Sequence, residues 1–166
     1  TSIPDLVSSV KKGVFKAADS QVAARWGNIT DFKKFELITP NEKEARFSLA
    51  DQDSSISVLI KKLEKQTKHK NLILKLGEKG AIAQPNIRAK LLSFTIPSFA
   101  TKVIDSTGSG DALLSYATLA MVASRSLLIS AIIGSVAAAC ECENDGNIAI
   151  DPDQLIIKLI MIEIAR

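Results

Sequence analysis

The segment Asp105-Ser106-Thr107-Gly108-Ser109-Gly110-Asp111 links an apolar approach, Val103-Ile104, to a long helical pattern that begins at Ala112. Glycines on either side of a small residue let successive backbone N–H groups turn toward one point, where an anion can bind. The first turn of the following helix presents its unpaired N–H groups and its positive dipole end to the same point. Asp111 adds a carboxylate there, which is typical of a base that accepts a hydroxyl proton beside a phosphate. A tight turn before a capped helix is the alternative interpretation.

The composition indicates a globular chain of ordinary core content. Its 166 residues, 46% of them hydrophobic, can form one domain, and 21 basic and 18 acidic residues are mixed along the sequence. The basic run at 61–70 contains no interleaved aromatic residue, so it predicts a solvated helix face rather than a nucleic-acid surface. No apolar run reaches about eighteen residues. We therefore expect a cytoplasmic protein without a membrane or nucleic-acid partner.

The cysteines and the single histidine predict no catalytic or metal site. Cys140 and Cys142 lie one residue apart in an apolar helical pattern, so they point to different sides of a helix and are expected to be reduced, structural thiols. His69 follows lysines at a predicted helix end. We expect its side chain to be exposed.

Apolar strand patterns alternate with amphipathic helix patterns along the chain, which predicts an α/β fold. The expected order is α-β-β-α-α-β-β-β-α-α-α, with strands that become antiparallel late. Strands are expected at 14–18, 35–39, 72–76, 81–83 and 90–96, and helices from Ser2 to Gly13, from Asn41, over 56–63, 112–123 and 127–142, and from Asp151.

Three local features complete this expectation. Trp26-Gly27-Asn28 has the composition of a loop, and small residues should let the helices at 112–123 and 127–142 pack closely. The last helix should bury a face made of Leu155, Ile156, Leu159 and Ile160.

Asn41 and Glu44 follow the strand that ends at Thr39 and Pro40, and two interpretations of this pair remain open. The spacing predicts a capping box, which stabilises a helix by about 1 kcal/mol. The same position is the carboxyl end of a strand, where open α/β sheets bind ligands.

Three motifs, in this order, resemble the ribokinase (PfkB) family of carbohydrate kinases. Asn41-Glu42-Lys43-Glu44 resembles the family's N-x-x-E motif, and Leu74-Lys75-Leu76-Gly77-Glu78-Lys79-Gly80 resembles its nucleotide-binding strand and loop. The segment 105–111 resembles the signature D-[TS]-x-G-[AS]-G-D, the most specific of the three. The resemblance covers nearly the whole chain.

The resemblance implies a ribokinase-like (Rossmann-like) three-layer α/β sandwich, of which this chain would be the C-terminal part only. Residues 1–166 are expected to form a single partial domain, the nucleotide-binding and catalytic half of a sugar kinase. The first half of the sheet, the sugar-binding segment and the lid would lie outside it, so the chain alone is expected to be an incomplete enzyme.

For the catalytic step, the resemblance implies that Asp111 is the base that takes the proton from the sugar hydroxyl. It also implies that Gly108, Ser109 and Gly110 supply a backbone anion hole for the migrating phosphoryl group. Removal of one such donor typically costs about 3 kcal/mol of transition-state stabilisation.

For the cofactors, ATP and Mg²⁺, the resemblance implies two sets of residues. Asn41 and Glu44 would act on Mg²⁺ and the nucleotide phosphates, mostly through water. The residues that would lie along the nucleotide are Lys75, Gly77, Glu78 and Gly80.

Four further positions take roles from the same resemblance. Asp105 and Thr107 match positions that hold a monovalent cation, such as K⁺, in some members. Ser135 falls near the adenine, where many members carry an asparagine, so this sequence departs from the pattern there. Asp19 ends a strand where relatives often place an acidic residue near the phosphates, and a role in a turn is the alternative.

The implied function is transfer of the γ-phosphoryl group of ATP to a hydroxyl of a sugar or sugar phosphate, in a protein expected to be a homodimer at full length. Thr39-Pro40-Asn41 and Gly146-Asn147-Ile148 are most similar to kinases that act on heptose phosphates. A non-catalytic nucleotide-binding remnant, acting as a regulatory or assembly module, is the alternative. A dinucleotide-binding oxidoreductase is disfavoured, because no G-x-G-x-x-G opens a first βαβ unit.

Overall fold

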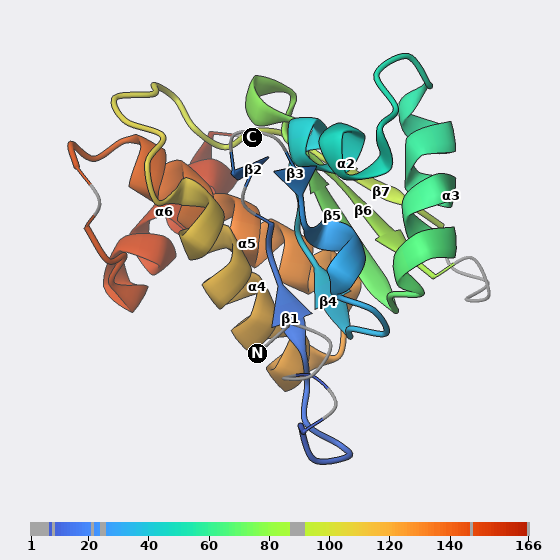
Figure 1. The fold of residues 1–166 in the computed structure, drawn as a ribbon. Helices are drawn as coiled ribbons and strands as arrows, with labels where there is room; N and C mark the ends of the chain where they lie inside the picture. Colours follow the sequence, from blue (N-terminus) through green and yellow to red (C-terminus); the bar gives the residue numbers. More distant parts are fainter. Residues whose placement is uncertain are drawn as a thin grey trace. The chain divides into compact units, whose positions relative to one another are not determined.

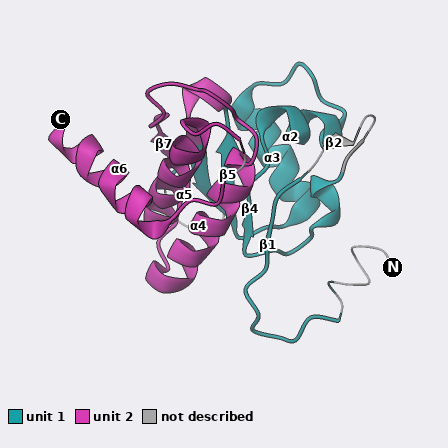
Figure 2. Ribbon diagram, turned by 90° about the vertical axis from the view of Figure 1, so that its left-hand side faces the viewer, with its two compact units in different colours: residues 1–76, 82–93 teal, residues 77–81, 94–166 magenta. Residues whose placement is uncertain are grey.

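The computed structural model describes residues 7, 9–20, 22–23, 26–86, 92–146 and 148–165 (Figure 1), and for 22–23 and 26–27 only the backbone. The chain divides into two compact units (Figure 2). Unit 1 comprises Thr1–Leu76 and Ile82–Ser93, and unit 2 comprises Gly77–Ala81 and Phe94–Arg166. Of the helix expected from Ser2 to Gly13, Val7 is helical, but residues 9–13 form turns and irregular backbone, so the prediction is wrong for that part; 1–6 and 8 lie outside the described residues. Gly13, its expected end, has a φ of 88°, which suits a chain reversal.

The main sheet has the strand order β1-β4-β5-β6-β7. Its strands are β1 (Ala17–Ala18), β4 (Leu37–Ile38), β5 (Asn71–Lys75), β6 (Ala81–Pro85) and β7 (Phe94–Ile96). The pairs β1–β4 and β4–β5 are parallel, with Ala17 opposite Leu37 and Leu37 opposite Asn71. Asn86 N donates to Lys70 O at 2.8 Å, which joins the end of β6 to the start of β5 as in an antiparallel pair. The predicted change from parallel to antiparallel strands is thereby confirmed.

In unit 1, the helices α2 (Glu42–Leu49) and α3 (Ile56–Thr67) contribute to one buried apolar cluster with the sheet. Leu37 is parallel-paired on both sides and, like the centre of β5, fully buried, as expected of strands covered on both faces. The buried members of this cluster are Ala18, Ile29, Phe35, Ile38, Ala45, Leu59, Ile60, Leu63, Leu72 and Leu74.

The prediction of a loop at Trp26-Gly27-Asn28 is wrong for its first two residues. Trp26–Gly27 forms the strand β3, which pairs antiparallel with β2 (Val22–Ala23) and precedes a 3₁₀ turn, η1 (Ile29–Asp31). The residue types at this point favour a turn, whereas pairing with the preceding segment supplies the backbone hydrogen bonds of a short strand. The local amino-acid composition does not indicate which segment a short strand will pair with.

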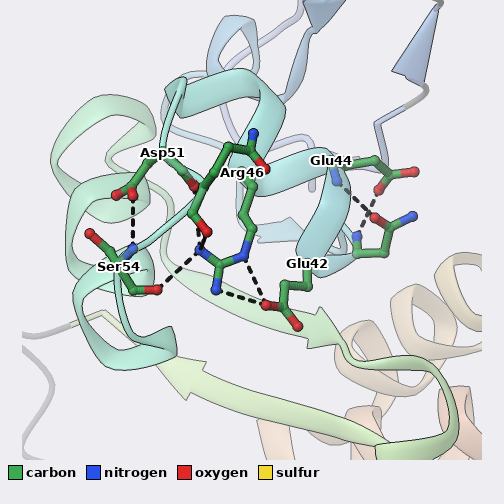
Figure 3. A network of polar contacts seen from close by, with 7 residues as sticks. Glu42, Glu44, Arg46, Asp51 and Ser54 are labelled. Atoms are coloured by element: carbon green, nitrogen blue, oxygen red, sulfur yellow. Dashed lines mark hydrogen bonds and ion pairs between the residues drawn. The ribbon is translucent and has the colours of Figure 1, made fainter.

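Arg46 holds the loop between α2 and α3 (Figure 3). Its Nε and Nη2 atoms both lie 2.8 Å from Glu42 Oε1, one turn earlier on α2. Its Nη1 atom donates to the carbonyl oxygens of Asp51, Gln52 and Ser54 at 3.3, 3.2 and 3.0 Å. A planar guanidinium can make these contacts simultaneously, whereas a lysine ammonium cannot reproduce their geometry.

Asp51 closes the same loop from the other side. Its Oδ2 atom lies 2.6 Å from Lys62 Nζ on α3, and its Oδ1 atom accepts from Ser54 N at 3.0 Å. The hydrogen bond from Lys62 and those from Ser54 hold the pKa of Asp51 well below its usual range.

The basic run lies on an exposed face, as predicted, but His69 does not. The exposed members of the run are Lys61, Lys62, Lys65, Lys68 and Lys70. His69 is 1% exposed, because α3 ends at Lys68 with a φ of 53° and this left-handed turn directs the next side chain inward. The expectation of an exposed histidine was therefore wrong.

The hydrogen bonds of Thr67 determine which nitrogen of His69 carries the proton. The Thr67 hydroxyl donates to Leu63 O at 2.9 Å, so it must accept from His69 Nδ1, 2.6 Å away. The neutral ring is therefore protonated on Nδ1. Burial lowers the pKa of His69 from 6.5 to about 4.

We expect the free energy of unfolding to fall as the pH is lowered from 6.5 to about 4, because the unfolded chain then binds a proton that the folded chain excludes. The loss from this one group should be about 3 kcal/mol. His69→Gln, which cannot gain a proton, should be less stable at pH 7 but should show a shallower decline. Urea unfolding of both proteins at several pH values measures the difference. A difference that does not change with pH would contradict the assignment.

Unit 2 is built on the helices α4 (Ser109–Ser124), α5 (Leu127–Cys142) and α6 (Pro152–Ile164), with the 3₁₀ turn η2 (Gly77–Lys79) and β7. The predicted close packing of α4 on α5 is confirmed at Gly134. A Cβ atom there would lie 2.8 Å from Ala117 Cβ and 2.9 Å from Leu113 O. Ser130 reinforces the contact by donating to Ala117 O at 2.7 Å.

The buried face of α6 differs from the predicted one. The helix begins at the expected place, with Asp151 as its cap, but Ile156 and Ile160 are 51% and 50% exposed. Lys158 is buried instead, since its ammonium lies 2.7 and 2.9 Å from the carboxylate oxygens of Glu143. This ion pair turns a different face inward. That face consists of Leu155, Lys158, Leu159 and Ile162.

Two further observations concern the described residues. Cys140 is buried and Cys142 is half-buried, and both are free thiols. In the part of the chain that the structure describes, no helix combines the length and apolar character needed to span a bilayer.

Candidate functional site

In unit 1, three parallel strands end at one edge of the sheet and bring polar residues together. Asp19 follows β1, Asn41 follows β4 by way of Thr39 and Pro40, and Lys75 is the last residue of β5. The strands β1, β4 and β5 are neighbours and parallel, so their carboxyl ends are adjacent. This edge is where open α/β sheets bind ligands.

Asp19 and Lys75 form an ion pair at this edge. Their side chains are each 16% exposed, and the Lys75 ammonium donates to Asp19 Oδ2. The backbone of Lys75 is also fixed, because its N–H donates to Pro40 O at 3.0 Å and the residue is paired with Asn41. Each residue is a candidate from the sequence, but the sequence does not predict their pairing, since 56 positions separate them.

Asn41 and Glu44 form the predicted capping box. Asn41 Oδ1 accepts from Glu44 N at 2.8 Å, and Glu44 Oε2 accepts from Asn41 N at 2.7 Å (Figure 3). The box orients both side chains at the start of α2. Its use of Glu44 Oε2 leaves the other carboxylate oxygen outside the box.

Glu44 carries a charge that the fold compensates only in part. The residue is 8% exposed, and burial raises the pKa of its carboxyl against the smaller effects of the Asn41 N–H and Lys75. Thr39, which is fully buried at the end of the preceding strand, has a hydroxyl with no hydrogen-bond partner among the described residues. A bound cation and an ordered water would satisfy these two groups.

The donor set fits Mg²⁺ in chemical type. Asp19, Asn41 and Glu44 offer carboxylate and amide oxygens, which are the ligands that hard divalent cations prefer. Within the described residues, no group of three or more His, Cys, Asp or Glu side chains could hold a metal ion. A Mg²⁺ ion at this edge would therefore keep most of its waters and rely on nucleotide phosphates, as is usual for this ion.

In unit 2, the signature segment forms a glycine turn that opens α4. Gly108 has a φ of 82°, a conformation that glycine adopts without strain, and α4 begins at Ser109. No side chain caps the helix. Ser109 N donates to Ser106 O at 3.3 Å, which leaves the N–H groups of Gly110 and Asp111 for water or an anion. The Ser109 hydroxyl donates to Ser106 O at 2.8 Å. Asp111 lies exposed in the first helical turn.

The structure also brings Asp105 and Thr107 together. Thr107 N donates to Asp105 Oδ1 at 2.8 Å. This backbone hydrogen bond, with a second one from the Thr107 side chain, lowers the pKa of Asp105. The carboxylate is thus kept ionised at a position that the family resemblance assigns to a monovalent cation.

The end of α5 anchors the approach to the signature segment. Cys142 O accepts from Ile104 N at 2.7 Å and from Asp105 N at 3.3 Å. Glu143 Oε1 accepts from the N–H and hydroxyl of Thr101 at 2.7 and 2.9 Å. Thr101 and Glu143 were not predicted from the sequence, because nothing in their local pattern relates two segments 42 residues apart.

The remaining predicted residues of unit 2 are Gly77, Glu78, Gly80 and Ser135. Gly77 and Glu78 lie in the exposed turn η2. Gly80 has a φ of 83° and lies against the chain after β7, where an added Cβ would be 2.1 Å from Ile96 O. Ser135 lies on α5 with its hydroxyl buried and without a hydrogen-bond partner among the described residues.

We expect Gly80→Ala to destabilise the protein by about 3 kcal/mol or more, because an alanine would collide with the backbone at Ile96 and Pro97. Gly77→Ala is the matched control. Gly77 also has a positive φ, 61°, but no atom lies within 4 Å of the added Cβ, so the cost should be about 1 kcal/mol. Urea unfolding measures both changes. Equal losses would show that the contact with Ile96 is not tight.

These units define an α/β protein whose strand ends carry an Asp–Lys–Glu cluster and whose glycine-led helix has the features of a phosphate site. The chain belongs to the pfkB family of carbohydrate kinases, whose model matches residues 12–154. Membership confirms the resemblance drawn from the three motifs. A search of curated proteins found no match.

Solved structures of similar fold include Escherichia coli phosphofructokinase-2 in complex with potassium, at 20% identity and a TM-score of 0.80 over 97% of this chain and 52% of that one. Arabidopsis thaliana ribokinase complexed with ribose and ATP matches at 21% identity and a TM-score of 0.78, over 95% of this chain and 51% of that one. The chain thus spans about half the length of these structures. The matches confirm the expected ribokinase-like α/β fold.

Proposed function

We propose that this chain supplies the nucleotide-binding and catalytic part of an ATP-dependent carbohydrate kinase. The reaction would transfer the γ-phosphoryl group to a hydroxyl of a sugar or sugar phosphate. The observation that carries the proposal is the uncapped Gly-Ser-Gly start of α4, with Asp111 in its first turn, in a chain of the pfkB family. The activity of the whole protein is part of the proposal, because the chain covers 52% of a matched structure.

In the proposed reaction, Asp111 accepts the proton of the sugar hydroxyl as that oxygen forms a bond to the γ-phosphorus. The bond from this phosphorus to the bridging oxygen breaks, and ADP leaves with the electron pair. The backbone N–H groups of Gly108, Ser109 and Gly110 stabilise the charge on the phosphoryl oxygens. The N–H groups of Gly108 and Gly110 would need little reorganisation, because the turn already orients them, whereas Ser109 N would first have to leave Ser106 O, 3.3 Å away.

The residues of unit 1 would bind the polyphosphate. Mg²⁺, when bound with the nucleotide, would neutralise phosphate charge, and Asn41 and Glu44 would hold it mostly through water. Lys75 would contact a phosphate. Burial at the carboxyl edge of the sheet supports these roles, because charge interactions are stronger where water is partly excluded.

The residues of unit 2 would bind the rest of the nucleotide and a monovalent cation. Gly77, Glu78 and Gly80 would line the nucleotide, and Ser135 would lie near the adenine. Asp105 and Thr107 would hold K⁺, in support of which the matched phosphofructokinase-2 structure is described as a complex with potassium.

The acceptor sugar and the assembly are also proposals. The acceptor would be a heptose phosphate or related sugar. This part of the proposal depends only on the similarity of residues 39–41 and 146–148 to kinases that act on heptose phosphates. The complete protein would be a homodimer, and E. coli phosphofructokinase-2 is described as tetrameric in an inhibited form.

ATP with Mg²⁺ should bind to the chain and raise its melting temperature, because a ligand that binds only the folded state stabilises it. Glu44→Gln should weaken the part of this effect that requires Mg²⁺. Calorimetry and thermal melting with ATP, with and without Mg²⁺, measure both effects. Absence of nucleotide binding to the folded chain would contradict the proposed site.

In the complete protein, Asp111→Asn should lower turnover about a hundredfold or more and leave the affinity for ATP nearly unchanged. Asp153→Asn is the matched control, because Asp153 also lies exposed in the first turn of a helix, α6. Coupled measurement of ADP release compares the variants. Near-normal turnover in Asp111→Asn would favour the non-catalytic alternative or another base.

A further inference from the structure

The Lys75 ammonium interacts with both carboxylates at the sheet edge of unit 1. It is paired with Asp19 directly. Its backbone is paired with Asn41, whose N–H in turn holds the Glu44 carboxylate at 2.7 Å. Glu44 accordingly interacts electrostatically with both Lys75 and Asp19. The three charged groups therefore form one cluster with a net charge of −1 when all are ionised.

Two different cations can use the Asp19 carboxylate, and they compete for it. A divalent cation binds carboxylate oxygens directly or through one water, and an ammonium at the same oxygen repels it. Lys75 can also leave Asp19 and end this competition. A lysine has a flexible four-carbon stem, and its ammonium binds phosphate as readily as carboxylate.

We propose that Lys75 couples phosphate binding to divalent-cation binding at this edge. Without nucleotide, its ammonium holds Asp19 and keeps a divalent cation away. When nucleotide phosphates arrive, the ammonium moves from Asp19 to a phosphate oxygen, and Asp19 and Glu44 become available to the metal. The inference rests on the proposed function, because it takes nucleotide phosphates as the second partner of Lys75.

The coupling predicts how tightly the chain binds a divalent cation when no nucleotide is present. The wild-type chain should bind Mn²⁺ alone only weakly, and Lys75→Met should bind it at least tenfold more tightly, because the competing charge is gone. The gain should disappear in the double variant Asp19→Asn/Lys75→Met. Lys75→Arg, which keeps a cation against Asp19, should remain weak.

Mn²⁺ titration followed by electron paramagnetic resonance tests the inference without any catalytic assay. Lys61→Met is the matched control, because Lys61 is exposed on α3 and its loss changes the net charge equally. A second titration, with ATP in the presence of EDTA, should show weaker binding to Lys75→Met than to wild type. Circular dichroism verifies folding, and Lys75→Gln replaces Lys75→Met if the latter does not fold.

The outcomes separate this inference from the proposed function. If wild type binds no ATP with Mg²⁺, the proposed function fails and the inference with it. If wild type binds ATP with Mg²⁺ but all variants have the same affinity for Mn²⁺, the coupling is overturned while the proposed function stands. A gain in Lys75→Met that persists without Asp19, or that Lys61→Met reproduces, also overturns it.

Discussion

The parallel pairing of β1, β4 and β5 is the constraint on which the polar edge of unit 1 depends. Parallel neighbours place their carboxyl ends side by side, so residues distant in sequence meet there. Asp19 and Lys75 are brought into contact in this way, and the bridge between Asn41 and Lys75 adds the start of α2. The fully buried side chains of β4 and β5 hold this register, because a slip would disrupt their packing on both faces of the sheet.

In unit 2, the corresponding constraint is the packing of α4 on α5. Gly134 permits a helix approach that no larger residue would allow, and this approach fixes the direction in which α4 leaves the signature turn. The far end of α5 then holds the chain before the signature segment through Cys142 O and Glu143. The turn before α4 is thus held on both sides by one helix, which is the preorganisation that anion stabilisation requires.

Several residues contribute to folding and also have a role in the proposed chemistry. The structure shows their contribution to folding directly. Asn41 and Glu44 close a capping box, so their presence in the N-x-x-E motif has a local reason as well as a proposed functional one. Gly80 is required by the backbone at Ile96, whatever its relation to a nucleotide. Both interpretations of the Asn41–Glu44 pair therefore remain compatible.

The sequence by itself determined the features that depend on neighbours along the chain. The capping box at Asn41, the start of α6 at Asp151, the glycine turn before α4, the helices α4 and α5 and the late change to antiparallel strands all follow from local residue types and spacing. Family membership followed from the motifs as well.

Only the tertiary structure decided what depends on residues distant in the chain. The Asp19–Lys75 pair, the inward turn of His69 and the rotation of α6 set by Lys158 and Glu143 are of this kind. In the first and third cases, a partner distant in the sequence compensates the charged side chain, whereas His69 is satisfied by Thr67 next to it and is buried by the packing around it. Periodicity records which residues are apolar, but it contains no information about which buried polar groups will find partners.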